Sequence, residues 1–365
     1  MVRLVKNPLA FALSGVLACL ISHGAEPAPA GTSPAYEIFV SNERSDNLTV
    51  IDGRSLKVLA TIPVGKRPRG IHASPDGKRV YVAVSGTPLS PPPKLDANGN
   101  PIFHKSDDDD DDDKKSDKSA DGIAVVDVAQ RKVIGKLPAG SDPEQFVVSS
   151  DGKKLFISNE DVGTASALDI ATKKVEHIIP VKREPEGVGI RPDGKVFYVT
   201  CETEGEIYAV DAATCKVITH FSVGGRPRSV DFLPDGSRAF IPSESTGLMH
   251  VVDSMAHKPM DTITLPKGSR PMCVKVSPDG AQVYVTTGRG GSVCVLDAKT
   301  QQVTDTIKVG TRPWGLAISP DGKFLYTANG PSDDISVVDL SSKKETQRVK
   351  AGSSPWGIAL VPKTD

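Results

Sequence analysis

The amino-acid sequence repeats a unit of about 42 residues along most of its length. A Pro-Asp-Gly or Ser-Asp-Gly turn followed by a short apolar stretch recurs six times, as in "SPDGKRVYV" and "SPDGKFLYT". Successive turns are 42 or 44 residues apart, but the first two are 75 apart; the glycines are Gly77, Gly152, Gly194, Gly236, Gly280 and Gly322. Such a period is typical of folds in which each unit packs on its neighbours, so it constrains the fold more than any other feature.

A proline and an aspartate also recur at fixed positions of the repeat. We call each such set of equivalent residues a column, and these two columns raise the number of units to seven. A proline stands nine residues before each of these glycines, and a seventh proline follows near the end of the chain: Pro68, Pro143, Pro185, Pro227, Pro271, Pro313 and Pro355. An aspartate stands 16 or 18 residues before each proline: Asp52, Asp127, Asp169, Asp211, Asp253, Asp297 and Asp339. The seven units therefore extend from Tyr36 to Val361.

Each unit is expected to form four short strands, which are "GLAIS", "FLYTAN", "ISVVD" and "TQRVK" in the last complete unit. Glycine supplies the positive φ of the Pro-Asp-Gly turn, and the column aspartate can close the turn after the third strand. The sequence therefore predicts an all-β fold, a seven-bladed β-propeller of four-stranded antiparallel blades. Residues 36–63 supply three strands and residues 357–361 supply one, so we expect the ring to close by pairing the N-terminal strands with the C-terminal strand.

Several phrases resemble those of known protein families. "YVAV", "FYVT", "LYTAN" and "SPDG" are similar to the YVTN-repeat β-propellers across the whole repeat region. "FISNEDVGTAS" (156–166) and "RPWGLAISPDGKFLYTANGPSDDISVVD" (312–339) resemble a narrower family, the periplasmic propeller proteins associated with catabolism dependent on pyrroloquinoline quinone (PQQ). The resemblance implies a place in quinoprotein-dependent alcohol oxidation and does not define a reaction.

The N-terminus is typical of an export signal. Arg3 and Lys6 precede an apolar run from Leu9 to Ile21, so residues 1–24 are expected to be a signal peptide and residues 25–35 a Pro-rich linker. The run is short for a membrane span, and lipid attachment at Cys19 is the alternative. A periplasmic protein that does not span the membrane follows, with residues 362–365 as a C-terminal tail.

Charge and cysteine content argue against several classes of function. Without residues 1–24 the chain has 42 basic and 45 acidic residues, and the segment 87–121 holds ten acidic and five basic ones. The remainder is close to neutral, which argues against nucleic acid or an anionic membrane as a partner. Four cysteines match no zinc or haem spacing and are expected to be free thiols: Cys201, Cys215, Cys273 and Cys294.

The long first step of the repeat is an insertion. Its 33 extra residues fall between the second and third strands of the first complete unit, in the segment 87–121, which includes seven consecutive aspartates at 107–113. This composition predicts a disordered acidic loop at the end of the propeller that carries the ring of prolines.

The residues beside the seven prolines should surround one mouth of the central channel, since they begin the innermost strands. We predict a ligand or partner site there, formed by Arg67, Arg69, Asp142, Glu144, Glu184, Glu186, Arg226, Arg228, Arg270, Arg312, Trp314 and Trp356. The alternative is that charges such as Arg69 with Glu144, or Glu186 with Arg228, only pair between blades. The two tryptophans are expected to be contact residues, with lids over the core as the alternative.

A second column, eight residues after each turn glycine, is rich in glutamate. Its glutamates are Glu43, Glu160, Glu202 and Glu244, and Asn42, Asn159 and Asn329 stand beside this column. Oxygen ligands of this kind can bind a divalent cation, which is the possible cofactor. The alternative is that these carboxylates are solvated.

Grouped nucleophile and base residues are absent from the sequence, because the histidines are scattered over the units. Three functions remain open. The favoured one is a non-catalytic periplasmic binding protein, a monomer, that binds a quinoprotein dehydrogenase or its small-molecule substrate at the mouth. The second is a metal-assisted hydrolase of lactonase type, and the third is a scaffold or surface protein without a ligand.

Overall fold

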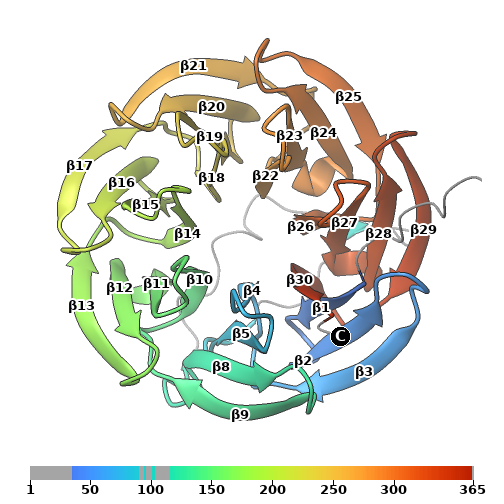
Figure 1. The fold of residues 1–365 in the computed structure, drawn as a ribbon. Helices are drawn as coiled ribbons and strands as arrows, with labels where there is room; N and C mark the ends of the chain where they lie inside the picture. Colours follow the sequence, from blue (N-terminus) through green and yellow to red (C-terminus); the bar gives the residue numbers. More distant parts are fainter. Residues whose placement is uncertain (1–34, 90–93, 96–100, 103–115, 364–365) are drawn as a thin grey trace, which may run out of the picture. The chain divides into compact units, whose positions relative to one another are not determined.

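Seven four-stranded antiparallel sheets surround a common axis in the computed structural model, which describes residues 35–89, 94–95, 101–102 and 116–363 (Figure 1). The predicted seven-bladed β-propeller is confirmed. Residues 34–365 group into one compact unit. The signal peptide predicted at residues 1–24 and nearly all of the linker lie outside the described residues.

Blade 1 joins the two ends of the propeller. In blade 1 the first strand named is the outermost one. In every other blade the first strand named is the innermost one. Blade 1 has β3 (Val58–Pro63), β2 (Asn47–Asp52), β1 (Tyr36–Asn42) and β30 (Pro355–Pro362); blade 2 has β4 (Ile71–Ala73), β5 (Arg79–Val84), β8 (Gly122–Asp127) and β9 (Lys132–Leu137); blade 3 has β10 (Pro143–Val148), β11 (Lys154–Asn159), β12 (Thr164–Asp169) and β13 (Lys174–Pro180); blade 4 has β14 (Pro185–Ile190), β15 (Val196–Cys201), β16 (Glu206–Asp211) and β17 (Val217–Ser222).

The remaining blades follow the same order. Blade 5 has β18 (Asp231–Phe232), β19 (Arg238–Ser243), β20 (Leu248–Asp253) and β21 (Lys258–Thr264); blade 6 has β22 (Val274–Val276), β23 (Gln282–Thr286), β24 (Ser292–Asp297) and β25 (Val303–Lys308); blade 7 has β26 (Pro313–Ile318), β27 (Phe324–Asn329), β28 (Asp334–Asp339) and β29 (Lys344–Lys350). The helical elements of the described residues are three 3₁₀ turns, Glu160–Val162, Gly288–Gly290 and Gly330–Ser332, and no helix there is long and apolar enough to cross a membrane.

The ring closes where the sequence predicts. β1 pairs antiparallel with β30, from Tyr36 opposite Pro362 to Val40 opposite Ile358 and beyond. The hydroxyls of Tyr36 and Tyr326, 2.5 Å apart, add a buried hydrogen bond between blades 1 and 7. Since this pairing joins the first and last strands of the ring, it protects two edges that would otherwise be exposed.

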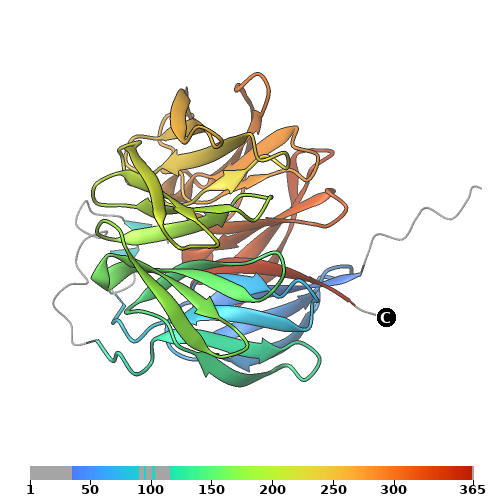
Figure 2. The same cartoon turned by 60° about the vertical axis from the view of Figure 1, so that its left-hand side comes forward.

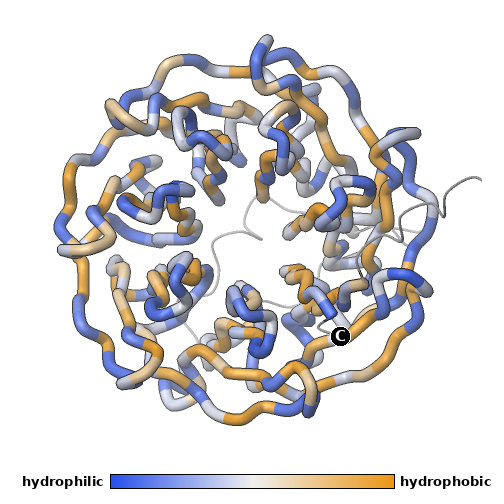
Figure 3. The backbone as a smooth tube through the Cα atoms, viewed as in Figure 1, coloured by the Kyte–Doolittle hydropathy of each residue, from blue (hydrophilic) through white to orange (hydrophobic). Residues whose placement is uncertain are grey.

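Apolar side chains of the inner and middle strands fill the space between neighbouring blades, which stack face to face (Figure 2). Phe156 of blade 3 stacks on Phe197 of blade 4 with ring centroids 4.3 Å apart. Along the strands hydrophobic and hydrophilic residues follow one another closely (Figure 3). Because each sheet buries both faces against neighbours, stability of the ring depends on contacts between blades.

The turns behave as the repeat predicts. Gly77 has φ +68°, and Asp76 accepts a hydrogen bond from the Lys78 N–H at 3.1 Å. The column aspartate Asp211 accepts one from the Thr214 N–H at 2.7 Å. Local polar contacts of this kind fix the turn and hence the register of the strands.

The insertion lies between β5 and β8, as predicted, because Val84 pairs directly with Gly122. Its end is ordered: Asp121 accepts hydrogen bonds from the N–H groups of Gly86 and Asp142, at 2.8 and 3.2 Å. The prediction that the whole segment 87–121 is disordered is therefore wrong for residues 116–121, which the body of blade 2 and the start of blade 3 hold in place. The aspartate run at 107–113 lies outside the described residues.

Candidate functional site

The ring prolines stand at one mouth of the channel: four of them begin the innermost strands β10, β14, β26 and β30, and the other three precede β4, β18 and β22 by three or four residues. Six of the seven residues that precede a ring proline have a left-handed backbone, with φ between +46° and +59°: Arg67, Asp142, Glu184, Arg226, Arg312 and Ser354. This conformation is unfavourable for a residue before proline, and strained residues of this kind gather at functional sites. Aspartates of adjacent loops hold it: Asp46 accepts the Arg67 N–H at 3.0 Å, and Asp333 accepts the Ser354 N–H at 2.8 Å.

The residues that follow the prolines form one ring, which we call the mouth ring. Each blade contributes one member: Trp356, Arg69, Glu144, Glu186, Arg228, Met272 and Trp314, for blades 1 to 7. Below the mouth ring is a cavity of about 350 Å³, lined by the innermost strands of all seven blades. Glu186, Arg228, Trp314 and Trp356 line this cavity, so the structure brings these predicted residues together.

Arg69 is the centre of a first group of charges. It is 2% exposed, and its guanidinium contacts Asp142, Glu144 and Glu160, the last at 3.2 Å. Arg67 lies above it and contacts Glu43 at 3.1 Å and Asp142 at 3.4 Å. The predicted pairing of Arg69 with Glu144 is therefore present, within a larger network.

Arg228 is the centre of a second group. Its guanidinium contacts Glu186, Glu202 at 2.5 Å and Glu244 at 2.6 Å. Arg226 contacts Glu202, and the Arg270 Nε lies 3.5 Å from Glu244. One buried guanidinium thus holds three carboxyl groups, and only Glu186 of the three lines the cavity.

The environment shifts the pKa values of these carboxyl groups in opposite directions. Burial raises the pKa of Glu160 to about 7, with Arg69 opposing the shift and Glu186 and Asp142 adding to it. Burial also opposes ionisation of Glu244, yet Arg228 lowers the pKa of that carboxyl to about 2. At neutral pH Glu160 is therefore partly protonated while Glu244 is ionised, and carboxyl groups with separated pKa values are typical of acid–base sites.

Glu202 belongs to the neutral kind. Burial raises its pKa well above the usual value, and a hydrogen bond to Glu186 adds to the shift. The proximity of the two carboxyl groups disfavours ionisation of Glu202, because two adjacent carboxylates cannot both ionise cheaply. Glu186 thus faces the cavity, and the carboxyl group of Glu202 lies behind it.

The other half of the mouth ring is aromatic. Trp314 and Trp356 stack with ring centroids 5.7 Å apart and planes 29° apart. The guanidinium carbons of Arg312 and Arg228 lie 5.0 and 5.9 Å from the Trp314 ring centre, within cation–π range. Both indoles are half-buried, so they present surface to the cavity as contact residues would.

The four glutamates of the predicted cation site are divided among three arginines. Glu43 contacts Arg67 and Glu160 contacts Arg69, while Glu202 and Glu244 contact Arg228. No group of three or more His, Cys, Asp and Glu side chains suited to a metal ion occurs among the described residues. The side-chain amides of the three asparagines donate hydrogen bonds within their own blades. Asn42 donates to Asn47 Oδ1, Asn159 to the Ser166 hydroxyl and Asn329 to the Ser336 hydroxyl.

Glu184 is separate from both groups of charges. It accepts a hydrogen bond from the Thr203 hydroxyl and lines a second, more polar hollow of about 840 Å³ that also includes Arg67, Asp142 and Glu160. Sequence reasoning missed Gln145, Asp231 and Lys275, which also line the channel cavity. Their position three or fewer residues beyond a mouth-ring residue was the signal that could have identified them.

Comparisons with known proteins agree on the fold. The family model described as "Lactonase, 7-bladed beta-propeller" matches residues 187–353. Antigen Lp49 of Leptospira interrogans is 27% identical over 138 residues, which are 33% of this chain and 30% of that protein. The chain thus spans less than a third of the length of this relative.

Solved structures give the same result. A hydrazine synthase chain of Kuenenia stuttgartiensis superposes with a TM-score of 0.68 at 19% identity, covering 83% of this chain and 92% of that one. A candidate 6-phosphogluconolactonase of Bacteroides fragilis gives 0.69 at 17% identity, covering 91% and 99%. At these identities the likeness shows the fold alone.

Proposed function

We propose that the protein is a hydrolase that opens lactones, which are cyclic esters, at the channel mouth. The observation that carries the proposal is the Glu186–Glu202–Arg228 group, in which the Glu186 carboxyl group faces the cavity and is backed by a buried guanidinium and by Glu202, whose pKa burial raises. The lactonase family model, whose match includes Glu202, Arg228 and Trp314, supports the same reaction class. The sequence alone favours binding without catalysis. The charged group and the family match together favour hydrolysis.

Each group has a defined role in the proposed reaction. Glu186 takes a proton from a water molecule as that water attacks the carbonyl carbon of the ring. The ring C–O bond then breaks, and the proton returns through Glu186 to the alkoxide oxygen that leaves. Glu202 orients the Glu186 side chain through their hydrogen bond, and Arg228 offsets the negative charge that develops. The products are a carboxylate and a hydroxyl on one molecule.

The residues do not fit the metal-assisted form of this reaction. Glu43, Glu160, Glu202 and Glu244 each contact an arginine, and a divalent cation among them would have to displace these guanidinium groups. Cations of like charge at such short range repel strongly. The proposed steps therefore use the side chains alone.

The test measures hydrolysis of a panel of γ- and δ-lactones. The acid that hydrolysis releases is detected with a pH indicator in a weakly buffered solution. We expect activity in the wild type and a loss of at least about 100-fold in kcat for Glu186→Gln, which keeps the shape and removes the base. Glu176→Gln is the matched control, because Glu176 lies on the outer strand β13, where it pairs with Lys154 of β11. Absence of turnover with every lactone, or full activity of Glu186→Gln, would overturn the proposal.

A binding function is the second candidate, because the Trp314–Trp356 stack is a ready contact surface. In this form the mouth binds a quinoprotein dehydrogenase or its small-molecule substrate and serves PQQ-dependent alcohol oxidation. Co-purification from alcohol-grown cells tests it: changing both tryptophans to alanine should abolish a captured partner. If the same proteins are captured with and without the indoles, the mouth is not the contact.

Export to the periplasm is part of either function. We propose cleavage after about residue 24, with a lipidated Cys19 as the alternative, from the charges and apolar run of the N-terminus. Mass spectrometry of the N-terminal peptide from fractionated cells distinguishes them. A chain that begins at Met1 in the cytoplasmic fraction would contradict both.

A further inference from the structure

A second ring of channel residues lies below the mouth ring on the same innermost strands. It comprises the residues three positions after each mouth-ring member, about 10 Å further along the strand. Three of them are polar and line the cavity, namely His72, Asp231 and Lys275. The other four are small or apolar: Val147, Gly189, Ala317 and Ala359. Three polar side chains from three different blades therefore line the cavity at this level.

Lys275 carries the positive charge of this ring. Its side chain is 41% exposed, and the partner that the structure gives its Nζ among the described residues is Asp231, whose Oδ2 is 3.9 Å away. That distance is too long for a hydrogen bond, and the same oxygen already accepts the Val276 N–H at 2.9 Å. Asp231 raises the pKa of Lys275, so the side chain remains an ammonium group with donors directed at the channel.

His72 is a neutral acceptor in the same ring. Gln145 Oε1 accepts the Phe146 N–H and also lies 3.1 Å from His72 Nε2, so Nε2 carries the proton and donates, which leaves Nδ1 as an acceptor. Burial lowers the pKa of His72 to about 4, and the charge of Lys275 adds to the shift. An edge contact with Phe146, 5.0 Å between ring centres, fixes the imidazole.

These groups define the chemistry of a ligand. An ammonium group binds a carboxylate, whereas a neutral imidazole nitrogen and the Asp231 carboxylate accept hydrogen bonds from a hydroxyl. We propose that this level of the channel is a binding site for small hydroxycarboxylates, held by Lys275 at the carboxylate and by His72 and Asp231 at the hydroxyl. The site goes beyond the proposed function and stands without it, although opening a lactone yields a molecule of this chemistry.

The half-buried thiol of Cys273 provides a reporter inside the channel. It lines the cavity, whereas Cys201, Cys215 and Cys294 are buried. The probe is 4-hydroxybutyrate, compared with butyrate, which lacks the hydroxyl, and 1,4-butanediol, which lacks the carboxylate. The rate of Cys273 alkylation by iodoacetamide, read by peptide mass spectrometry, and titration calorimetry both report binding.

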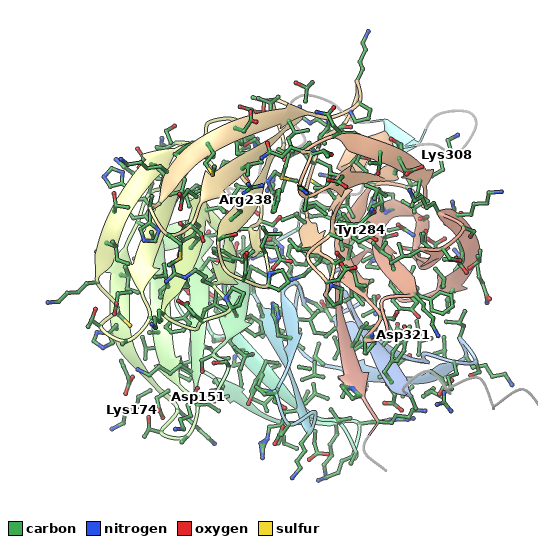
Figure 4. All side chains as sticks on the ribbon, turned by 45° about the horizontal axis from the view of Figure 1, so that its top comes forward. Asp151, Lys174, Arg238, Tyr284, Lys308 and Asp321 are labelled. Atoms are coloured by element: carbon green, nitrogen blue, oxygen red, sulfur yellow. The ribbon has the colours of Figure 1, made fainter. Side chains whose placement is uncertain are left out.

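We expect 4-hydroxybutyrate to protect Cys273 saturably in the wild type, butyrate to protect it more weakly and the diol not at all. Lys275→Met should weaken binding at least tenfold, and Lys275→Arg should restore most of it. The control is Lys308→Met, which removes the same charge from the exposed face of β25, away from the channel (Figure 4). His72→Ala should remove the preference for 4-hydroxybutyrate over butyrate.

Equal protection by acid and diol, or unchanged affinity in Lys275→Met, would overturn the proposal. If Lys275→Met unfolds, as circular dichroism would show, then Lys275→Arg and His72→Ala decide the outcome instead. Glu186→Gln separates the two proposals, because it should lose hydrolysis and keep this binding. A wild type that hydrolyses no lactone but binds 4-hydroxybutyrate would refute the proposed function alone.

Discussion

The two halves of the mouth ring use one backbone position for opposite chemistry. Blades 2 to 5 place Arg69, Glu144, Glu186 and Arg228 after the ring prolines, whereas blades 6, 7 and 1 place Met272, Trp314 and Trp356 there. In the charged half nearly every group is buried and bound to an opposite charge. In the aromatic half the indoles are half-buried and stacked. The comparison teaches that the charged half is rigid and suited to proton transfer, while the aromatic half is suited to contact with a ligand.

The largest effect is expected from removing the centre of the charged half. Arg228→Met leaves Glu186, Glu202 and Glu244 without their common guanidinium, which should lower the free energy of unfolding by about 3–5 kcal/mol. Urea unfolding measures it. Arg348→Met is the control, since Arg348 pairs with Glu345 on an outer strand and should cost at most about 1 kcal/mol. Equal costs would show that the charged half is no more than a surface network.

Of the two halves of the mouth ring, the charged half should show a pH effect between about pH 4.5 and 7. Because the pKa of Glu160 rises from its usual 4.5 to about 7, the native state binds more protons than the unfolded state between these values. Stability should therefore fall as pH rises from about 4.5 to about 7, by about 2–3 kcal/mol from this group. Glu160→Gln should reduce the slope of the free energy of unfolding against pH. An unchanged slope would mean that Glu160 ionises normally.

Glu244 should act in the opposite direction. Its pKa of about 2 lies below the usual 4.5, so its contribution to stability is present above pH 4.5 and is lost as pH falls towards 2. Glu244→Gln should flatten the acid limb of the stability profile and leave the slope between pH 5 and 7 unchanged. Thermal unfolding at several pH values measures both limbs, and a change above pH 5 would contradict the assignment.

A smaller effect is expected in the aromatic half. Trp314→Ala removes the stack on Trp356 and the cation–π contact with Arg312, and should cost about 1–2 kcal/mol. Trp314→Phe keeps a ring and should cost less. Denaturant unfolding compares the two variants, and a loss as large as that of Arg228→Met would mean that the indole is a structural lid.

The smallest effect is expected from the insertion. Replacing residues 90–115 by a short Gly-Ser linker keeps the ordered contacts of Asp121 and the pairing of β5 with β8. Loop-closure entropy changes slowly with length, so the free energy of unfolding should change by at most about 0.5 kcal/mol. Loss of folding would refute the position of the insertion between β5 and β8.

The regular features of the propeller were predictable from sequence because the repeat fixes them. The proline column located the mouth ring, and the step of 75 residues located the insertion. The contact of Arg228 with Glu186 was predictable, but its contacts with Glu202 and Glu244 were not. These two contacts depend on the conformations of long side chains, which the repeat does not fix. The His72–Lys275 level was missed because its members come from blades 2, 5 and 6 and differ in side-chain type, although each stands three residues after a mouth-ring residue.

The same limit explains the glutamate column. A fixed spacing showed that Glu43, Glu160, Glu202 and Glu244 share a level, but the residues facing them decide their chemistry. In the structure those residues are arginines, which stand beside the ring prolines of the same or a neighbouring blade. Two columns that look independent in the sequence are therefore one network.

The most direct test of the division between the two halves is a comparison of kcat and KM for lactone hydrolysis in Glu186→Gln and Trp314→Ala. If the charged half performs the chemistry and the aromatic half holds the substrate, Glu186→Gln lowers kcat at least about 100-fold with little change in KM, and Trp314→Ala mainly raises KM. A wild type without turnover, or variants that both change KM alone, would contradict the account.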